Sequence, residues 1–188
     1  MKLLHIDSSI LGEGSVSRQL TASIVEQFRK ADPSIEVITR DLVAEPVPHM
    51  TIATLPAANP DLRDDLKQLQ SADIVVIGAP MYNFSVPTQL KAWIDRIAIA
   101  GESFRYTETG PEGLLGGRRV IVALSRGGHY GAGTPAESLE HTETYLRSVF
   151  GFIGITPEFI AADGIGLGPD ARTAAIEKAL GDVSALAA

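Results

Sequence analysis

Short runs of apolar residues alternate along this chain with segments whose apolar residues recur every three or four positions. The runs are typical of buried strands, and the three-to-four spacing is typical of amphipathic helices. Strands are predicted at about 3–7, 35–42, 74–77, 119–125 and 155–162, and helices at about 18–31, 61–71, 88–100, 137–150 and 170–186. Strand and helix therefore alternate five times along the sequence.

This alternation predicts an α/β fold in which helices cover both faces of one parallel sheet. Five strands suit the doubly wound, flavodoxin-like order 2-1-3-4-5 with right-handed crossovers. The length of 188 residues fits a single domain spanning 1–188. Ligands of such sheets bind outside the carboxyl ends of the strands, so the loops after the first, third and fourth strands should converge on one site.

Two stretches follow neither pattern. Residues 44–60 contain Pro46, Pro48, Pro56 and Pro60, which predicts a long surface loop. Residues 104–114 place Phe104 and Tyr106 among polar residues and glycines, and we expect a loop there as well.

Composition narrows the function classes. The net charge is −7 and the chain has no cysteine, which argues against a nucleic-acid or anionic-membrane partner and excludes disulfides and thiolate catalysis. No apolar run approaches the roughly 20 residues of a transmembrane helix, and the first residues resemble a strand rather than a signal peptide. A cytoplasmic protein is expected. The four scattered histidines predict no metal site.

The loop after the first strand is rich in serine and glycine. It contains Ser9, Ser15 and Ser17, and the last two lie just before a predicted helix, where hydroxyls and unpaired amides can bind a phosphate. The loop is neither a dinucleotide fingerprint nor a P-loop, so a monophosphate fits best. The alternative is that Ser15 or Ser17 only caps the helix.

The loops after the third and fourth strands carry groups that suit a flat heterocycle. Met81, Tyr82, Asn83 and Phe84 could cover such a ring and hydrogen-bond its edge, although aromatics in the core or on an oligomer surface are the alternative. The segment Ser125–Gly128, which includes Arg126 and Gly127, could bring backbone amides to the same ring, or could be a simple turn. His129 and Tyr130 follow; either could stabilise a developing charge, or His129 could be a solvated loop residue.

Together these blocks resemble one known family. The segments 8–11, 79–84, 88–91, 104–108, 110–114, 125–128 and 151–155 are similar to those of the FMN-dependent NADH azoreductases, also described as NADH:quinone oxidoreductases. The resemblance implies a flavodoxin-like homodimer with one FMN per subunit. It assigns the phosphate and ribityl end to Ser9, Ser15, Val16 and Ser17, and the ring to Met81, Tyr82, Asn83, Phe84, Ser125, Arg126, Gly127 and Gly128.

The resemblance also implies that Tyr106 and Phe152 close the substrate pocket of the partner subunit, and we expect Tyr130 at that pocket. The chain departs from the family in a shortened stretch at 51–60 and in Arg18, where a smaller polar residue is expected. These departures leave open the substrate preference and the choice between NADH and NADPH.

The expected activity is reduction of quinones and azo compounds by NADH or NADPH, in two alternating two-electron steps that transfer hydride through flavin N5. No residue is assigned a certain catalytic role, because the flavin carries the chemistry. One alternative is a flavodoxin-like electron carrier without a small-molecule substrate. Another is a phosphate-binding or response-regulator-like module, although Asp7 stands alone where such modules cluster acidic residues.

Overall fold

The computed structural model describes residues 1–55 and 63–186. Its centre is a five-stranded parallel sheet made of β1 (Lys2–Asp7), β2 (Glu36–Asp41), β3 (Ile74–Pro80), β6 (Arg119–Arg126) and β7 (Glu158–Asp163). The strands lie in the order β2-β1-β3-β6-β7. Counted along the chain, this is the predicted flavodoxin-like order 2-1-3-4-5, which is thereby confirmed.

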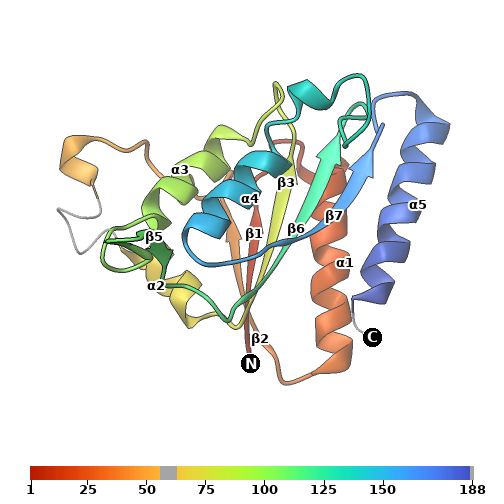
Figure 1. Cartoon of the computed structure of the whole chain (residues 1–188). Coiled ribbons are helices and arrows are strands. Elements are labelled where there is room, and N and C mark those ends of the chain that lie inside the picture. Colours follow the sequence, from red (N-terminus) through yellow and green to blue (C-terminus); the bar gives the residue numbers. More distant parts are fainter. Residues whose placement is uncertain (56–62, 187–188) are drawn as a thin grey trace.

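Helices cover both faces of the sheet (Figure 1). On one face lie α1 (Val16–Ala31) and α5 (Pro169–Ala185), and on the other lie α2 (Asp64–Ser71), α3 (Thr88–Ile97) and α4 (Glu143–Phe152). Alternate strand residues face opposite helical layers: Val76 packs with α1 and α5, whereas Val75 and Ile77 pack with α2, α3 and α4. All of β3 is buried, which explains its uninterrupted apolar sequence.

The predicted loop at 104–114 is wrong in part, because it contains an antiparallel hairpin of β4 (Phe104–Thr107) and β5 (Gly110–Gly113). The Thr107 hydroxyl donates to the carbonyl of Gly110 at 2.7 Å and closes the turn. The strands are short and largely exposed, so they leave no apolar pattern in the sequence. The buried ring of Phe104 anchors the hairpin, with its centroid 4.4 Å from that of Phe152.

Two predicted helix boundaries also differ. The helix expected from residue 137 begins only at Glu143, after a short 3-10 turn at Glu137–Leu139. The Glu140 carboxylate accepts hydrogen bonds from the amides of Thr142, Glu143 and Thr144, so this side chain defines where α4 begins. The helix expected to end near residue 100 ends at Ile97. The start predicted at residue 61 and part of the 44–60 loop lie outside the described residues.

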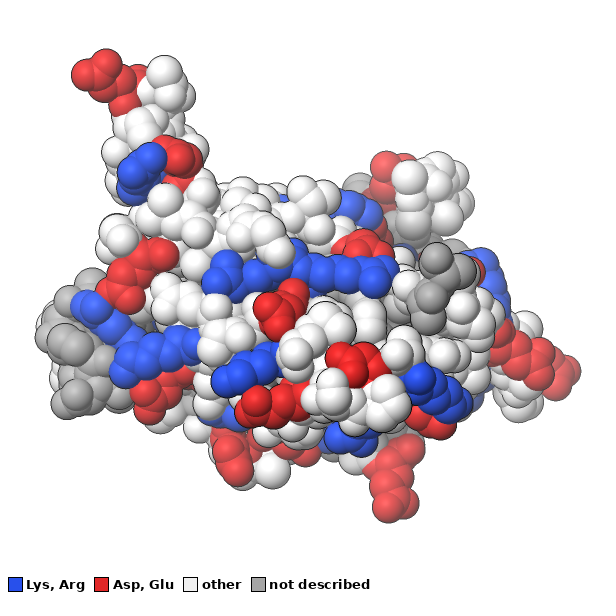
Figure 2. Space-filling view, turned by 90° about the horizontal axis from the view of Figure 1, so that it is seen from below, with Lys and Arg blue, Asp and Glu red and all other residues white. Residues whose placement is uncertain are grey.

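Charged side chains of both signs are interleaved on the surface. Figure 2, seen from below, shows Lys and Arg beside Asp and Glu, with no extended patch of one sign on the described part of that face. None of the helices in the described ranges combines the length and apolar character that crossing a bilayer requires.

Gly113→Ala is expected to destabilise the fold. A Cβ atom at residue 113 would lie 2.0 Å from the amide nitrogen of Gly154, and this clash is with backbone. Overpacking of this kind lowers the free energy of unfolding by about 1–3 kcal/mol or more, measurable by urea titration. Gly151→Ala is the matched control, because a Cβ there meets nothing within 4 Å. Equal stability of the two variants would contradict the close approach of β5 to the segment after α4.

Candidate functional site

Three loops meet at the carboxyl ends of the central strands. The Ser8 hydroxyl donates to the carbonyl of Gly78 at 2.6 Å, which joins the loop after β1 to β3. The Met81 amide donates to the carbonyl of Ser125 at 2.9 Å, which joins the loop after β3 to the end of β6. The three segments singled out from the sequence are therefore held to one another by direct hydrogen bonds.

The first loop ends in the N-terminus of α1. Ser15 is the N-cap, and its hydroxyl accepts from the amide of Arg18 at 3.2 Å. The hydroxyls of Ser15 and Ser17 lie 3.1 Å apart, and both residues are buried. Ser15 therefore does cap the helix, as the alternative reading held, but capping leaves the Ser17 hydroxyl and the first amides of the helix as donors for an anion. Val16 is buried in the core with α5 and β3, so its side chain is not open to a ligand.

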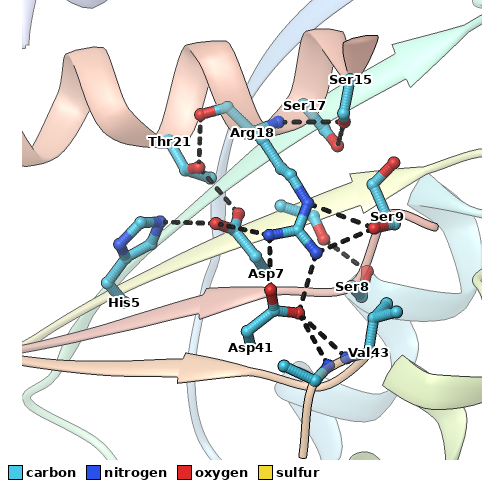
Figure 3. Close-up of polar contacts among 12 residues, drawn as sticks. His5, Asp7, Ser8, Ser9, Ser15, Ser17, Arg18, Thr21, Asp41 and Val43 are labelled. Atoms are coloured by element: carbon cyan, nitrogen blue, oxygen red, sulfur yellow. Dashed lines mark hydrogen bonds and ion pairs between the residues drawn. The ribbon is translucent and has the colours of Figure 1, made fainter. Parts of the chain in front are cut away.

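An ionic network joins the start of α1, next to this loop, to the ends of β1 and β2 (Figure 3). The Arg18 guanidinium forms a forked pair with Asp41 at the end of β2, with both nitrogen–oxygen distances at 2.8 Å. It also donates to the carbonyl of Ser9 at 3.1 and 2.9 Å. Asp7, at the end of β1, lies 3.7 Å from the same guanidinium and accepts from the Thr21 hydroxyl at 2.9 Å.

The pair with Arg18 lowers the pKa of Asp41 to about 2. Hydrogen bonds from the guanidinium are the largest cause, and the amides of Val43 and Ala44 add to the effect. Hydrogen bonding and positive charge both favour the ionised carboxylate. The Arg18–Asp41 pair therefore stays charged at any pH at which the protein is expected to work.

The second loop contains a strained turn. Tyr82 and Ser85 exchange two backbone hydrogen bonds around Asn83 and Phe84, which have φ values of 48° and 71°. Positive φ at both central residues is the geometry of a type I′ turn, in which asparagine is common and phenylalanine is not. Such conformations cost on the order of 1–3 kcal/mol each and are concentrated at functional sites. Both side chains point away from the core and are exposed.

Asn83 is exposed, so its side-chain amide is open to a ligand that enters between the loops. Tyr82 instead links two loops, because its hydroxyl lies 3.1 Å from that of Ser9 and accepts from the amide of Ile10 at 3.2 Å. A cleft of about 630 Å³ runs beside this turn, and its lining includes Ile10, Met81 and Tyr82. This volume is within the range of small-ligand sites.

The third loop is fixed by its buried arginine. The Arg126 side chain forms an ion pair with Asp163 at 2.6 and 3.0 Å and lies 3.3–3.4 Å from carboxylates of Glu143 and Glu140. It is 3% exposed, so only its backbone and the two glycines after it can face a ligand. The amides of Gly164 and Gly166 donate to carbonyls of this loop and tie it to the end of β7.

The two residues after these glycines point to different neighbours. The Tyr130 ring packs edge-on against Phe84, with centroids 6.1 Å apart, so Tyr130 belongs to the wall of the converging loops. His129 lies against Gly164, where an added Cβ would approach its ring to 2.8 Å. Of the two expected charge-stabilising residues, the structure thus brings Tyr130 to the aromatic turn and His129 to the loop after β7.

Tyr106, on β4, and Phe152, the last residue of α4, both pack against Phe104 of the β4–β5 hairpin. Phe104 contacts both rings, with centroids 5.5 Å from Tyr106 and 4.4 Å from Phe152. Figure 1 shows the hairpin away from the carboxyl ends of β3 and β6. Tyr106 is 75% exposed. The structure therefore does not bring these two residues into the cleft of their own chain.

Sequence reasoning missed the role of Asp41 and treated Arg18 only as a departure from the family pattern. A signal was present: in the predicted strand order the first two strands are neighbours, and Asp7 and Asp41 are register partners at their ends. Two adjacent carboxylates require a cation, and Arg18 lies in the first turn of α1.

Asp41→Asn should lower stability at pH 7 by about 1 kcal/mol, less than the full pKa shift implies because the carboxyl is partly exposed. The folded-state pKa lies below the ordinary value, so the stabilisation is complete above about pH 4 and is lost as pH falls toward 2. Urea unfolding from pH 7 to pH 2.5 should show the two proteins converging. Asp182→Asn, which removes an exposed pair on α5, is the control and should change stability by less than about 0.5 kcal/mol. A pH-independent gap between wild type and Asp41→Asn would contradict this account.

Comparisons with known proteins agree with this architecture. A family model described as "Flavodoxin-like fold" matches residues 1–187. The chain is 56% identical over 201 aligned positions to "FMN-dependent NADH:quinone oxidoreductase 2" of Bradyrhizobium diazoefficiens, and 54% identical over 202 to "FMN-dependent NADH:quinone oxidoreductase" of Methylorubrum extorquens. Both alignments cover the whole of each chain.

Solved structures show the same relation. An azoreductase from Bacillus anthracis superposes with a TM-score of 0.89 at 28% identity, covering 100% of this chain and 98% of that one. An FMN-dependent NADH-azoreductase from the same species, solved in complex with FMN, gives 0.86 at 27% identity and covers both chains fully. The chain therefore belongs to the flavodoxin-like family that contains the FMN-dependent NADH:quinone oxidoreductases.

Proposed function

We propose that this protein is an FMN-dependent NADH:quinone oxidoreductase that also reduces aromatic azo compounds. The observation that carries the proposal is the junction of three loops, one rich in serine, one aromatic and one rich in glycine, at the carboxyl ends of adjacent strands. Relatives that match along their whole length carry this function in their names. The same names and the FMN-bound azoreductase support FMN as cofactor and NADH as donor.

The residues present fit FMN. The hydroxyls of Ser9 and Ser17 and the first amides of α1 would hold the phosphate. The turn at 81–84 would cover the ring and meet its edge, and the backbone of 125–128 would donate to its other edge. Asn83 is exposed, so its side-chain amide is open to a ligand. When bound, FMN supplies the two-electron redox chemistry, and the protein supplies binding and orientation.

The chain's own residues orient and enclose the reactants. Phe84 and Tyr130 form an aromatic wall, and Tyr82 locks the ring-binding turn to the phosphate loop. The type I′ turn presents Asn83 and Phe84 in a fixed geometry before any ligand arrives, which lowers the entropic cost of orientation. The loops contain no nucleophile–base pair among the described residues, so positioning is the main protein contribution.

A homodimer explains the position of the hairpin. Tyr106 is largely exposed and far from its own cleft, so a second subunit that accepted it would complete a substrate pocket with Tyr106 and Phe152. This assembly, the cytoplasmic location and the use of one pocket by both substrates are parts of the proposal. They rest on the resemblance and on this exposed aromatic surface.

The purified protein, reconstituted with FMN, should show a flavin spectrum that bleaches when NADH is added without oxygen. Initial rates with a quinone acceptor at several fixed NADH concentrations should give parallel double-reciprocal plots, because donor and acceptor occupy one pocket in turn. Intersecting lines would exclude the alternating scheme. A flavin that stays oxidised with both NADH and NADPH would instead favour an electron carrier.

Ser17→Ala should weaken FMN binding about 10–150-fold, because it removes one hydrogen bond to a charged group, worth about 1.5–3 kcal/mol. Binding is measured by quenching of flavin fluorescence on titration with apoprotein. Ser184→Ala, near the C-terminal end of α5, removes a hydroxyl that bonds only within its helix and serves as the control. If both variants bind FMN like the wild type, Ser17 has no role beyond its contact with the N-cap.

A further inference from the structure

Every donor of the Arg18 guanidinium is already directed to a group within the chain. Nε and Nη2 donate to the carbonyl of Ser9, Nη1 and Nη2 donate to the two oxygens of Asp41, and Nη1 also faces Asp7 (Figure 3). A guanidinium has five N–H groups in a rigid planar fork; here it makes four hydrogen bonds, and its charge also faces Asp7 at 3.7 Å. Arg18 is therefore placed to hold the backbone of the first loop rather than to contact a ligand itself.

The carbonyl that Arg18 holds belongs to a residue expected to bind phosphate. Ser9 is almost fully buried, and its carbonyl points back toward Arg18 and the end of β2. A carbonyl oxygen aimed at a phosphate would repel it, whereas amides and hydroxyls attract it. By fixing the carbonyl on the far side, Arg18 leaves the Ser9 hydroxyl on the side of Tyr82, within the converging loops.

The other end of the same loop is held in the same way. The Nη2 of Arg172, in the first turns of α5, donates to the carbonyl of Gly14 at 2.9 Å. Both ends of the segment 9–14 are thus tied through their carbonyls to arginines outside it. Of these two, Arg18 is the more restrained, because Asp41 fixes its guanidinium with two hydrogen bonds.

Arg18 also offsets the negative charge of two carboxylates beside the expected phosphate site. Asp7 and Asp41 are register partners at the carboxyl edge of the sheet, beside the segment expected to bind a phosphate dianion. The Asp7 carboxylate is held in place there: it is buried, accepts from the Thr21 hydroxyl at 2.9 Å and lies 3.3 Å from Nε2 of His5. Without Arg18, two carboxylates would repel the phosphate.

We propose that Arg18, anchored by Asp41, is a positioning residue that makes this site selective for phosphorylated flavin over the unphosphorylated ring. The inference rests on the proposed function, since it assumes that the phosphate of FMN binds at the start of α1. It assigns a role to a residue that is expected to make no contact with the cofactor.

The experiment compares the dissociation constants of FMN and riboflavin for the apoprotein, measured by flavin fluorescence. Arg18→Gln should weaken FMN binding at least 10-fold and change riboflavin binding by less than about 3-fold. Arg18→Lys keeps the charge but loses the fork, so it should recover only part of the FMN affinity. Arg119→Gln is the matched control, because Arg119 forms a comparable forked pair with Glu158. Both residues begin their strands, β6 and β7, and so lie at the edge of the sheet opposite to the site. This variant should leave the FMN-to-riboflavin ratio unchanged.

An equal change in affinity for both flavins, or no change for either, would overturn the proposal and leave Arg18 a stabilising residue only. If Arg18→Lys binds FMN as tightly as the wild type does, the positioning role is overturned, and the positive charge by itself accounts for the effect of Arg18. If Arg18→Gln does not fold by circular dichroism, Asp41→Asn serves in its place, with a smaller loss of FMN affinity and an unchanged riboflavin affinity expected. Wild-type protein that binds neither flavin would refute the proposed function itself, which is a different result from any of these.

Discussion

The close parallel pairing of β1 with β3 is the constraint on which the site depends. It places Asp7 opposite Gly78, and only a residue without a side chain leaves room for the carboxylate above it. With that register, the loop after β1 forms hydrogen bonds with the carbonyl of Gly78 and the hydroxyl of Tyr82. The pairing of β3 with β6 then places the loop after β6 next to the other two. A shift of one residue along β1 would exchange its two faces and separate all of these contacts.

The arginines near the site bind backbone carbonyls and carboxylates of the chain, and their charges are not directed into the cleft. Arg18 and Arg172 hold carbonyls of the first loop, and buried Arg126 joins the third loop to the residues that begin α4 and end β7. Burial of a charge is costly unless it is paired, so Arg18 and Arg126 each require acidic partners. This requirement explains why acidic residues surround a site that is expected to bind an anion, in a chain whose net charge is −7.

Features with a regular period were predictable from the sequence, and features made by single contacts were not. The uninterrupted apolar runs and their alternation with helices gave the strand order, because strands buried on both faces admit few other arrangements. The β4–β5 hairpin escaped prediction because one buried phenylalanine, rather than an apolar face, anchors it. The start of α4 escaped because it is set by Glu140, which reads as an ordinary helical residue. At the site, residue types indicated the ligand, but the pairing of Arg18 with Asp41 depends on two segments that are adjacent only in space.

Strain and ion pairing together indicate a site that is formed before its ligand binds. Two successive residues with positive φ, one of them a phenylalanine, would relax in a loop without other restraints. Here the backbone of the turn is held on both sides: His141 donates its amide to the carbonyl of Phe84 at 3.0 Å, and Met81 donates its amide to Ser125. The first loop is held by Arg18 and the third by Arg126. Holding a strained turn and paired charges in place costs some stability, and it provides a cleft whose donors need little reordering when a flat, phosphorylated ligand enters.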